Sequence, residues 1–226
     1  VWEAVRLYKG ILIFIDDHLT RLWNAAIATG IRLPFTKNEL IDIINSVLLE
    51  NNMTDGVHVR IMVTRGIKKT PSQDPRLTIS GPNLVIIPEF KLADPKSKSK
   101  GIKLFTSTVR RGSPDYLDPK LNCHSKLHEV QALIQAIEAG ADEALMLDVN
   151  GFVSTCNSTN FFMVKNRVVY TSTGQYCMNG ITRQKIIEVC KANNIEVREV
   201  DFCVFFVFGG DVAFFTGTFA GGTAVI

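Results

Sequence analysis

The chain of 226 residues contains no long hydrophobic run. Its longest apolar stretches, at residues 10–15 and 202–209, fall well short of the roughly 20 residues that span a bilayer. The first residues also lack the basic stretch followed by an apolar stretch that is typical of a secretory signal. We therefore expect neither a membrane protein nor a secreted one.

The sequence has little excess of positive over negative charge, and it has few cysteines. The net charge of +3 is small and evenly spread, which argues against nucleic acid as a partner and favours small anionic ligands. The five scattered cysteines are typical of reduced thiols in the cytoplasm. With 46% hydrophobic and 21% charged residues, the composition is that of one large or two small globular domains.

Motifs for several common chemistries are missing from the sequence. It shows no Ser-His-Asp order, no nucleotide fingerprint and no P-loop. His124 and His128 lie four residues apart beside Cys123 and Glu129, but no second Cys/His cluster completes a ligand set. Because most zinc sites need three or four protein ligands, we expect no metal site.

Residues 1–92 have the pattern of a small α+β domain. Alternating apolar residues predict a hairpin at 1–8 and 11–14, followed by a helix that Asp16 or Asp17 caps. Thr36 and Glu39 form the capping box of a second helix. Strands are then predicted at 57–64 and 83–87.

Residues 93–101 are polar, rich in lysine and without periodicity, which is typical of an interdomain linker. Residues 102–226 are then a larger α/β domain, and its strands alternate with helices near 125–139 and 181–192. We expect the aromatic run at 202–208 to be buried as a strand or covered by a partner chain, because so much exposed aromatic surface favours aggregation.

Two loops of this larger domain place glycine and hydroxyl residues where backbone N–H groups are free to bind an anion. At the start of the predicted helix, the N–H groups of Ile181 and Thr182 and the Thr182 hydroxyl converge with the positive helix end. Gly217 and Thr218 belong to the second loop, at 216–222. Taken singly, the first loop is more typical of a plain helix cap, and the second is similarly typical of a tight turn.

Five segments of the chain together carry a resemblance to a known family. They are residues 1–10, 17–22, 139–153, 180–183 and 215–218. In this order and spacing the chain resembles the class IV, fold-type IV pyridoxal phosphate enzymes, which include branched-chain and D-amino acid aminotransferases and aminodeoxychorismate lyase. The resemblance covers nearly the whole chain, although family chains usually have further strands before and after it. It implies a two-domain α+β fold, a homodimer and amino acid and 2-oxo acid substrates.

The resemblance also assigns residues to the phosphate of the cofactor, pyridoxal 5'-phosphate. Arg21 matches the family arginine that pairs with this phosphate, and a guanidinium suits bidentate contact. Ile181 and Thr182 match the ligands at the helix start. Gly217 and Thr218 match the second phosphate loop.

At the reactive end of the cofactor the sequence departs from the family pattern. Asn122 stands where the family has the lysine that forms the Schiff base, and an amide cannot form one. Lys126, or less readily Lys120, is then the candidate catalytic lysine. Thr155 stands where the family has a glutamate that hydrogen-bonds the pyridine nitrogen, so we place Thr155 among the cofactor-binding residues.

Three hypotheses follow from these residues. The first is an aminotransferase that uses Lys126 or Lys120. The second is a degenerate member that binds the cofactor, or another small phosphate, without transamination; Asn122 and Thr155 favour it. The third is an aminodeoxychorismate lyase-like activity, which needs the same lysine as the first.

Overall fold

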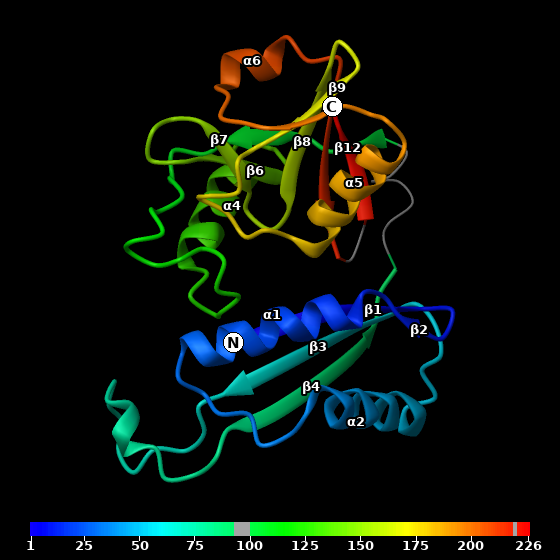
Figure 1. The fold of residues 1–226 in the computed structure, drawn as a ribbon. Coiled ribbons are helices and arrows are strands. Elements are labelled where there is room, and N and C mark those ends of the chain that lie inside the picture. Colours follow the sequence, from blue (N-terminus) through cyan, green and yellow to red (C-terminus); the bar gives the residue numbers. More distant parts are fainter. Residues whose placement is uncertain (93–99, 219–220) are drawn as a thin grey trace. The chain divides into compact units, whose positions relative to one another are not determined.

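The computed structural model describes residues 1–92, 100–218 and 221–226 (Figure 1). Its contacts divide the chain into two compact units. Unit 1 is Val1–Leu92 together with Asn122–His124, and the other described residues form unit 2. Most of the expected linker, residues 93–99, lies outside the described residues. None of the helices in the described ranges is long and apolar enough to cross a membrane.

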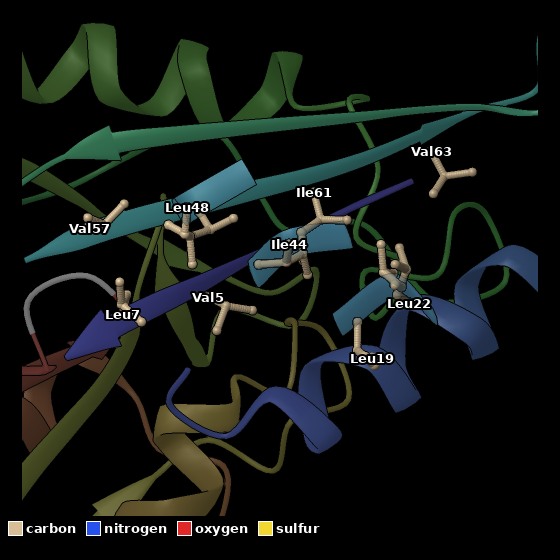
Figure 2. Packing of buried hydrophobic residues seen from close by; sticks show 11 residues of the cluster. Val5, Leu7, Leu19, Leu22, Ile44, Leu48, Val57, Ile61 and Val63 are labelled. Carbon is tan, nitrogen blue, oxygen red and sulfur yellow. The ribbon is translucent and has the colours of Figure 1, made fainter. Parts of the chain in front are cut away.

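Unit 1 is a four-stranded antiparallel sheet with the strand order β2-β1-β3-β4, and two helices pack on it. Its elements are β1 (Trp2–Tyr8), β2 (Ile11–Leu12), α1 (Ile15–Ala28), α2 (Lys37–Glu50), β3 (Val57–Thr64), a 3-10 turn at Pro75–Leu77, and β4 (Asn83–Phe90). Figure 2 shows apolar side chains from β1, β3, α1 and α2 gathered in one core. Every second residue of β3 enters this core, which is the pattern of a sheet covered on one face.

The local signals of unit 1 are mostly confirmed. The hairpin forms, and Thr36 and Glu39 make the capping box of α2. The predicted start of α1 is wrong by two or three residues, because the cap is Phe14 and not Asp16 or Asp17. Phe14 precedes the helix in a left-handed conformation, and Asp16 and Asp17 lie in its first turn, where their charges favour the positive helix end.

Unit 2 contains two sheets. Strands β5 (Leu104–Thr106), β6 (Glu143–Leu147) and β7 (Val153–Cys156) form the first sheet. The second has the order β10-β9-β8-β11-β12, with β8 (Asn160–Lys165), β9 (Val168–Thr171), β10 (Val197–Glu199), β11 (Val212–Gly217) and β12 (Gly221–Val225). Apolar residues of both sheets share one core, and the helix α5 (Ile181–Ala192) packs against the second sheet.

Helix α4 (Leu127–Glu138) packs on the first sheet of unit 2 through a face that its spacing does not suggest. Its buried apolar residues are Ala132 and Ala136, whose small side chains allow close approach to β6. The large residues whose spacing predicts the helix are all more than a third exposed: Leu127, Val130, Ile134 and Ile137.

The aromatic run at 202–208 does not form a strand, so the first of its two predicted arrangements is wrong, while coverage by a partner chain stays a prediction. Val204–Phe208 forms the short helix α6. Phe202 and Phe206 are four residues apart and turn to the same side, where Phe206 lies against Tyr170 with ring centroids 5.1 Å apart. Phe205 and Phe208 are 85% and 83% exposed. The run therefore has a helical period rather than the alternation of a strand.

Candidate functional site

The start of α5 in unit 2 has free backbone donors. Gly180 precedes the helix with extended backbone angles and makes no side-chain cap, so the N–H groups of Ile181 and Thr182 have no partner within the helix. A Cβ atom at Gly180 would lie only 2.3 Å from Oδ1 of Asn160. Glycine is therefore required here, because the loop approaches a neighbouring strand too closely for a side chain.

Asn160, the first residue of β8, lies between the two predicted anion-binding loops. Its Nδ2 donates to the carbonyl of Met178 at 2.9 Å, which fixes the loop before α5. In the sheet, Asn160 is paired with Thr216 of β11, the first residue of the second predicted loop. The structure thus brings the Gly180 loop and the 216–218 loop together in unit 2.

Thr216 is a candidate ligand that the sequence did not single out. It is 1% exposed, and its Oγ1 has no hydrogen-bond partner among the described residues. Its neighbour Gly217 lies close to Thr159, because a Cβ there would be 3.3 Å from a Thr159 methyl. A buried hydroxyl without a partner is costly, so it indicates a place for a bound group. Its sequence signal was its place at the start of the predicted loop 216–222, although only Gly217 and Thr218 were named there as ligands.

Together these groups fit an anion such as a phosphate. The backbone N–H groups of Ile181 and Thr182 and the Thr182 hydroxyl lie at the start of a helix. The Thr216 hydroxyl lies near the end of the strand that pairs with Asn160. A phosphate accepts several hydrogen bonds at once and is favoured by the positive end of a 12-residue helix. Gly217 is the last residue of β11 and pairs with Gly221 of β12, and Thr218 follows it as a turn residue.

Glu143 holds the turn between β7 and β8 in place. Its Oε1 accepts hydrogen bonds from the N–H and hydroxyl of Ser158 and from the hydroxyl of Thr159. Burial raises the pKa of the Glu143 carboxyl above its ordinary value, although these three bonds act in the opposite direction. The turn sets the position of Thr159 beside Gly217, so Glu143 supports the second loop without reaching it.

Thr155, on β7, has its hydroxyl already engaged within the protein. The hydroxyl donates to the carbonyl of Thr159 at 2.7 Å, and its oxygen accepts from Nδ2 of Asn160 at 3.4 Å. A neutral hydroxyl that donates to a carbonyl cannot provide the negative charge that stabilises a pyridinium. Thr155 therefore lies beside the anion-binding loops but does not fit the role of a carboxylate.

Lys126 immediately precedes α4 and belongs to a cluster of charged side chains in unit 2. Its Nζ lies 3.4 Å from Oε1 of Glu129, which also accepts a 2.7 Å bond from Nη1 of the buried Arg111. Although burial acts to raise it, the pKa of Glu129 lies below its ordinary value, because Lys126 and Arg111 favour the carboxylate. Burial lowers the pKa of His128, which lies 3.0 Å from the same carboxylate.

This cluster connects to the loop that leads to α5. Arg111 donates through Nε to the carbonyl of Tyr176 at 3.1 Å, and the hydroxyl of Ser154 donates to the same carbonyl. Two residues later, Met178 accepts the bond from Asn160. Through Arg111 and Asn160, the Lys126 cluster and the loop before α5 are both bonded to the segment 176–178 of unit 2.

Lys120, the other candidate amine, is more exposed than Lys126, and its Nζ lies 3.5 Å from the carbonyl of Gln175.

Asn122 is held by the first strand of unit 1. Its backbone carbonyl accepts a 3.0 Å bond from the N–H of Trp2. The residue is only 3% exposed, and its Oδ1 has no hydrogen-bond partner in the described part of the chain. Asn122, which the resemblance predicts at the family's lysine position, is thus a buried amide whose oxygen has no described donor.

Arg21, on α1 of unit 1, pairs with Glu3 of β1. Two bonds of 2.6 and 2.9 Å join the guanidinium to the Glu3 carboxylate, which also lies 2.8 Å from Nδ1 of His18. Burial alone raises the pKa of Glu3, but the hydrogen bonds of His18 and Arg21 outweigh it and bring the pKa below its ordinary value. Glu3 is fully buried, so it holds the guanidinium in one orientation.

The depressed pKa of Glu3 predicts an acid-sensitive unit 1. The ionised carboxylate stabilises the fold fully above the ordinary pKa of 4.5, and this stability is lost as the pH falls through the lower pKa of the folded state. We expect Glu3→Gln to be less stable than wild type at pH 7, with a smaller further loss between pH 5 and pH 3. Thermal unfolding of both proteins across this range tests the expectation, and parallel losses would contradict it.

Comparisons with known proteins place the chain in a family. The family model for class IV amino-transferases matches residues 1–226. Branched-chain-amino-acid aminotransferase-like protein 2 of Arabidopsis thaliana is 37% identical over 96% of this chain. The branched-chain-amino-acid aminotransferase of Pseudomonas aeruginosa is 31% identical over 97% of this chain and 73% of its own length. These two relatives cover nearly the whole chain.

A solved structure gives the same result at the level of the fold. A T.th. branched-chain amino acid aminotransferase, complexed with N-(5'-phosphopyridoxyl)-L-glutamate, matches with a TM-score of 0.89 and 26% identity, over all of this chain and 74% of its own. The predicted α+β fold-type IV architecture is thereby confirmed. The chain spans only 39% and 36% of the lengths of the two Arabidopsis relatives. On the match of the family model and the likeness of fold and relatives, the chain belongs to the class IV aminotransferase family.

Proposed function

We propose that the chain binds pyridoxal 5'-phosphate through its phosphate group and moves an amino group between an amino acid and a 2-oxo acid. The observation that carries this proposal is the arrangement in unit 2, where a helix start without a side-chain cap adjoins the buried Thr216 hydroxyl, which has no partner among the described residues. The family membership and the phosphopyridoxyl compound in a solved relative support the choice of cofactor.

The phosphate ligands in this proposal are the residues of the two loops. Ile181 and Thr182 donate from the start of α5, Gly217 and Thr218 from the second loop, and Thr216 adds its hydroxyl. Arg21 remains a prediction from the resemblance, in which its guanidinium pairs with the same phosphate. When bound, the cofactor supplies an aldehyde that condenses with amines and a ring that withdraws electrons from the substrate.

Lys126 is the proposed catalytic amine. Its Nζ would take up and return the proton of the substrate carbon, and Glu129, anchored by Arg111, holds that nitrogen beside the loop before α5. Thr155, whose hydroxyl is bonded to the carbonyl of Thr159, would be a neutral neighbour of the pyridine ring if the resemblance holds. An aminodeoxychorismate lyase-like activity requires the same amine, so it depends equally on Lys126.

A second candidate function is cofactor binding without amino transfer. Two observations favour it: Asn122 provides no amine at the predicted lysine position, and the Thr155 hydroxyl is already bonded to the carbonyl of Thr159. The anion-binding loops do not depend on either residue. Binding and turnover can therefore be separated experimentally.

The names of the relatives favour branched-chain amino acids as the amino donor. D-amino acids are the alternative substrates, because the family that the chain resembles includes D-amino acid aminotransferases.

We also propose that the chain forms a homodimer and acts in the cytoplasm. The five cysteines, which are all free, are compatible with that compartment.

Formation of glutamate from 2-oxoglutarate and a branched-chain amino acid tests the proposed turnover. We expect wild-type protein supplied with pyridoxal 5'-phosphate to form glutamate and Lys126→Ala to form none. Lys120→Ala serves as the matched control and should retain the activity. If wild type binds the cofactor and forms no glutamate, the second candidate function replaces the first.

The unpartnered hydroxyl of Thr216 predicts opposite effects on stability and on binding. Thr216→Val keeps the shape but removes a buried polar group without a partner, so the free protein should be at least as stable as wild type. Affinity for pyridoxal 5'-phosphate should fall by about tenfold, the value of one hydrogen bond to a charged group. Thermal unfolding and equilibrium titration measure the two effects, and unchanged affinity would exclude Thr216 as a ligand.

Arg21→Ala is expected to remove most of the affinity for pyridoxal 5'-phosphate, by about ten- to a hundredfold for the loss of charged hydrogen bonds. Because Glu3 is then left buried without this partner, the folded state of the variant must be verified by circular dichroism. Arg76→Ala, at an arginine whose side chain is 88% exposed, is the control and should bind like wild type. Equal affinity in Arg21→Ala would overturn the assignment.

A further inference from the structure

Helix α4 of unit 2 carries an apolar stripe on the face that points away from its own sheet. The four residues of this α4 stripe are between 49% and 71% exposed: Leu127, Val130, Ile134 and Ile137. The helix packs on β6 through Ala132 and Ala136, which lie on its other side. Single exposed apolar residues are common on proteins, but four in one row along a helix indicate a surface that another helix covers.

The spacing of the α4 stripe fits a second copy of the same helix. Its residues follow one another at intervals of three, four and three. This alternation is the one by which two helices pack through interlocking side chains. The intervals are the same from either end, so an antiparallel copy matches them: Leu127 of one copy faces Ile137 of the other, and the two middle residues face each other. A two-fold axis relates such a pair.

The charges at the two ends of α4 fit the same antiparallel arrangement. Glu138 is the last residue of the helix, where the dipole is negative, and the last turn has no basic residue. In a single helix this placement is unfavourable. Lys126 directly precedes the positive start of the helix, and 28% of its side chain is exposed. An antiparallel pair places Glu138 of each copy near the positive start of its partner's α4, so the repulsion becomes an attraction.

We propose that the α4 stripe is the contact surface between two copies of this chain, whose α4 helices pack antiparallel about a two-fold axis. The stripe is complementary to itself both in its spacing and in its end charges, which favours a second copy over an unrelated helix. The inference rests on the homodimer of the proposed function and assigns a surface to it. It does not depend on cofactor binding.

Ile134→Lys tests whether the α4 stripe is the contact. By symmetry the variant removes two buried isoleucines and adds two lysines, so we expect the dimer to dissociate about a hundredfold more readily or worse. Sedimentation equilibrium of the full chain measures the dissociation constant. Val189→Lys, at a 60% exposed position of α5, is the matched control and should dimerise like wild type. Ile134→Gln replaces the lysine variant if that protein does not fold.

A pair of opposite charges tests the antiparallel orientation. Leu127→Lys and Ile137→Glu should each weaken the dimer. The double variant should associate about tenfold more tightly than either single one, because each lysine then faces a glutamate of the other copy in two ion pairs. In a parallel pair, like charges would meet and the double variant would associate most weakly. That result would overturn the proposed arrangement.

The outcomes separate this inference from the proposed function. A wild-type dimer that Ile134→Lys leaves intact would overturn the α4 contact and keep the homodimer. A wild type that stays monomeric at every concentration measured would overturn both, and would leave the stripe to a partner of another kind. A dimeric wild type that does not bind pyridoxal 5'-phosphate would overturn the proposed cofactor binding and leave this inference in place.

Discussion

Asn122→Lys is expected to give the chain a covalent bond to pyridoxal 5'-phosphate that borohydride reduction makes permanent. The proposed phosphate ligands of unit 2 do not include residue 122, so we expect the substitution to leave them unchanged. The new lysine replaces an amide whose backbone is already fixed by Trp2. Absorbance near the visible edge before reduction, and mass spectrometry of the reduced peptide, measure the bond.

The same experiment on wild type decides between the two candidate functions. A reduced adduct on Lys126 supports the aminotransferase hypothesis, and an adduct on Lys120 would move the catalytic role to that residue. No adduct at saturating cofactor leaves a binding protein without the amine. In Asn122→Lys, adding Thr155→Glu should increase amino transfer, because a carboxylate then replaces a hydroxyl that is bonded to a carbonyl.

Gly180→Ala is expected to abolish tight binding of pyridoxal 5'-phosphate. The new methyl group would lie 2.3 Å from Oδ1 of Asn160, which cannot retreat because its Nδ2 is bonded to Met178. The start of α5 must therefore move, and the donors of Ile181 and Thr182 move with it. We expect an affinity loss of about a hundredfold, equivalent to losing two charged hydrogen bonds.

Gly112→Ala is the matched control for this substitution. Gly112 also lies in unit 2, but a Cβ atom there meets only a ring carbon of Tyr116, at 3.9 Å. This variant should bind the cofactor like wild type. If Gly180→Ala folds and also binds normally, the start of α5 does not hold the phosphate.

Much of the fold was predictable because its signals are local. The capping box of Thr36 and Glu39 and the alternation along β3 depend on neighbouring residues, and both appear as expected. Helix α4 shows where such reasoning ends. Its spacing gives the helix, but alanine size, not hydrophobicity, decides which face packs on β6. The strand predicted for the 202–208 run does not form, for a related reason. Phenylalanine occurs in both helices and strands, and here the packing on Tyr170 and on the core accompanies a helix.

The sequence indicates the motifs of the candidate site, but not the contacts that bring them together. Ile181, Thr182 and Gly217 follow from loops that precede or end regular elements. Asn160 and Thr216 could not be ranked from the sequence, because their importance comes from a strand pairing between residues far apart in the chain. The same holds for Arg111, whose bonds to Glu129 and to the Tyr176 carbonyl join distant segments.

The affinity for pyridoxal 5'-phosphate relative to pyridoxal, which lacks the phosphate, tests the central claim most directly. Equilibrium titration of the purified chain with both compounds measures the ratio, and inorganic phosphate added as a competitor identifies the group that is bound. If the loops of unit 2 hold the phosphate, the phosphorylated compound should bind about a hundredfold more tightly or better, as for two or more charged hydrogen bonds, and inorganic phosphate should displace it. Equal affinities, or binding that phosphate does not displace, would contradict the account.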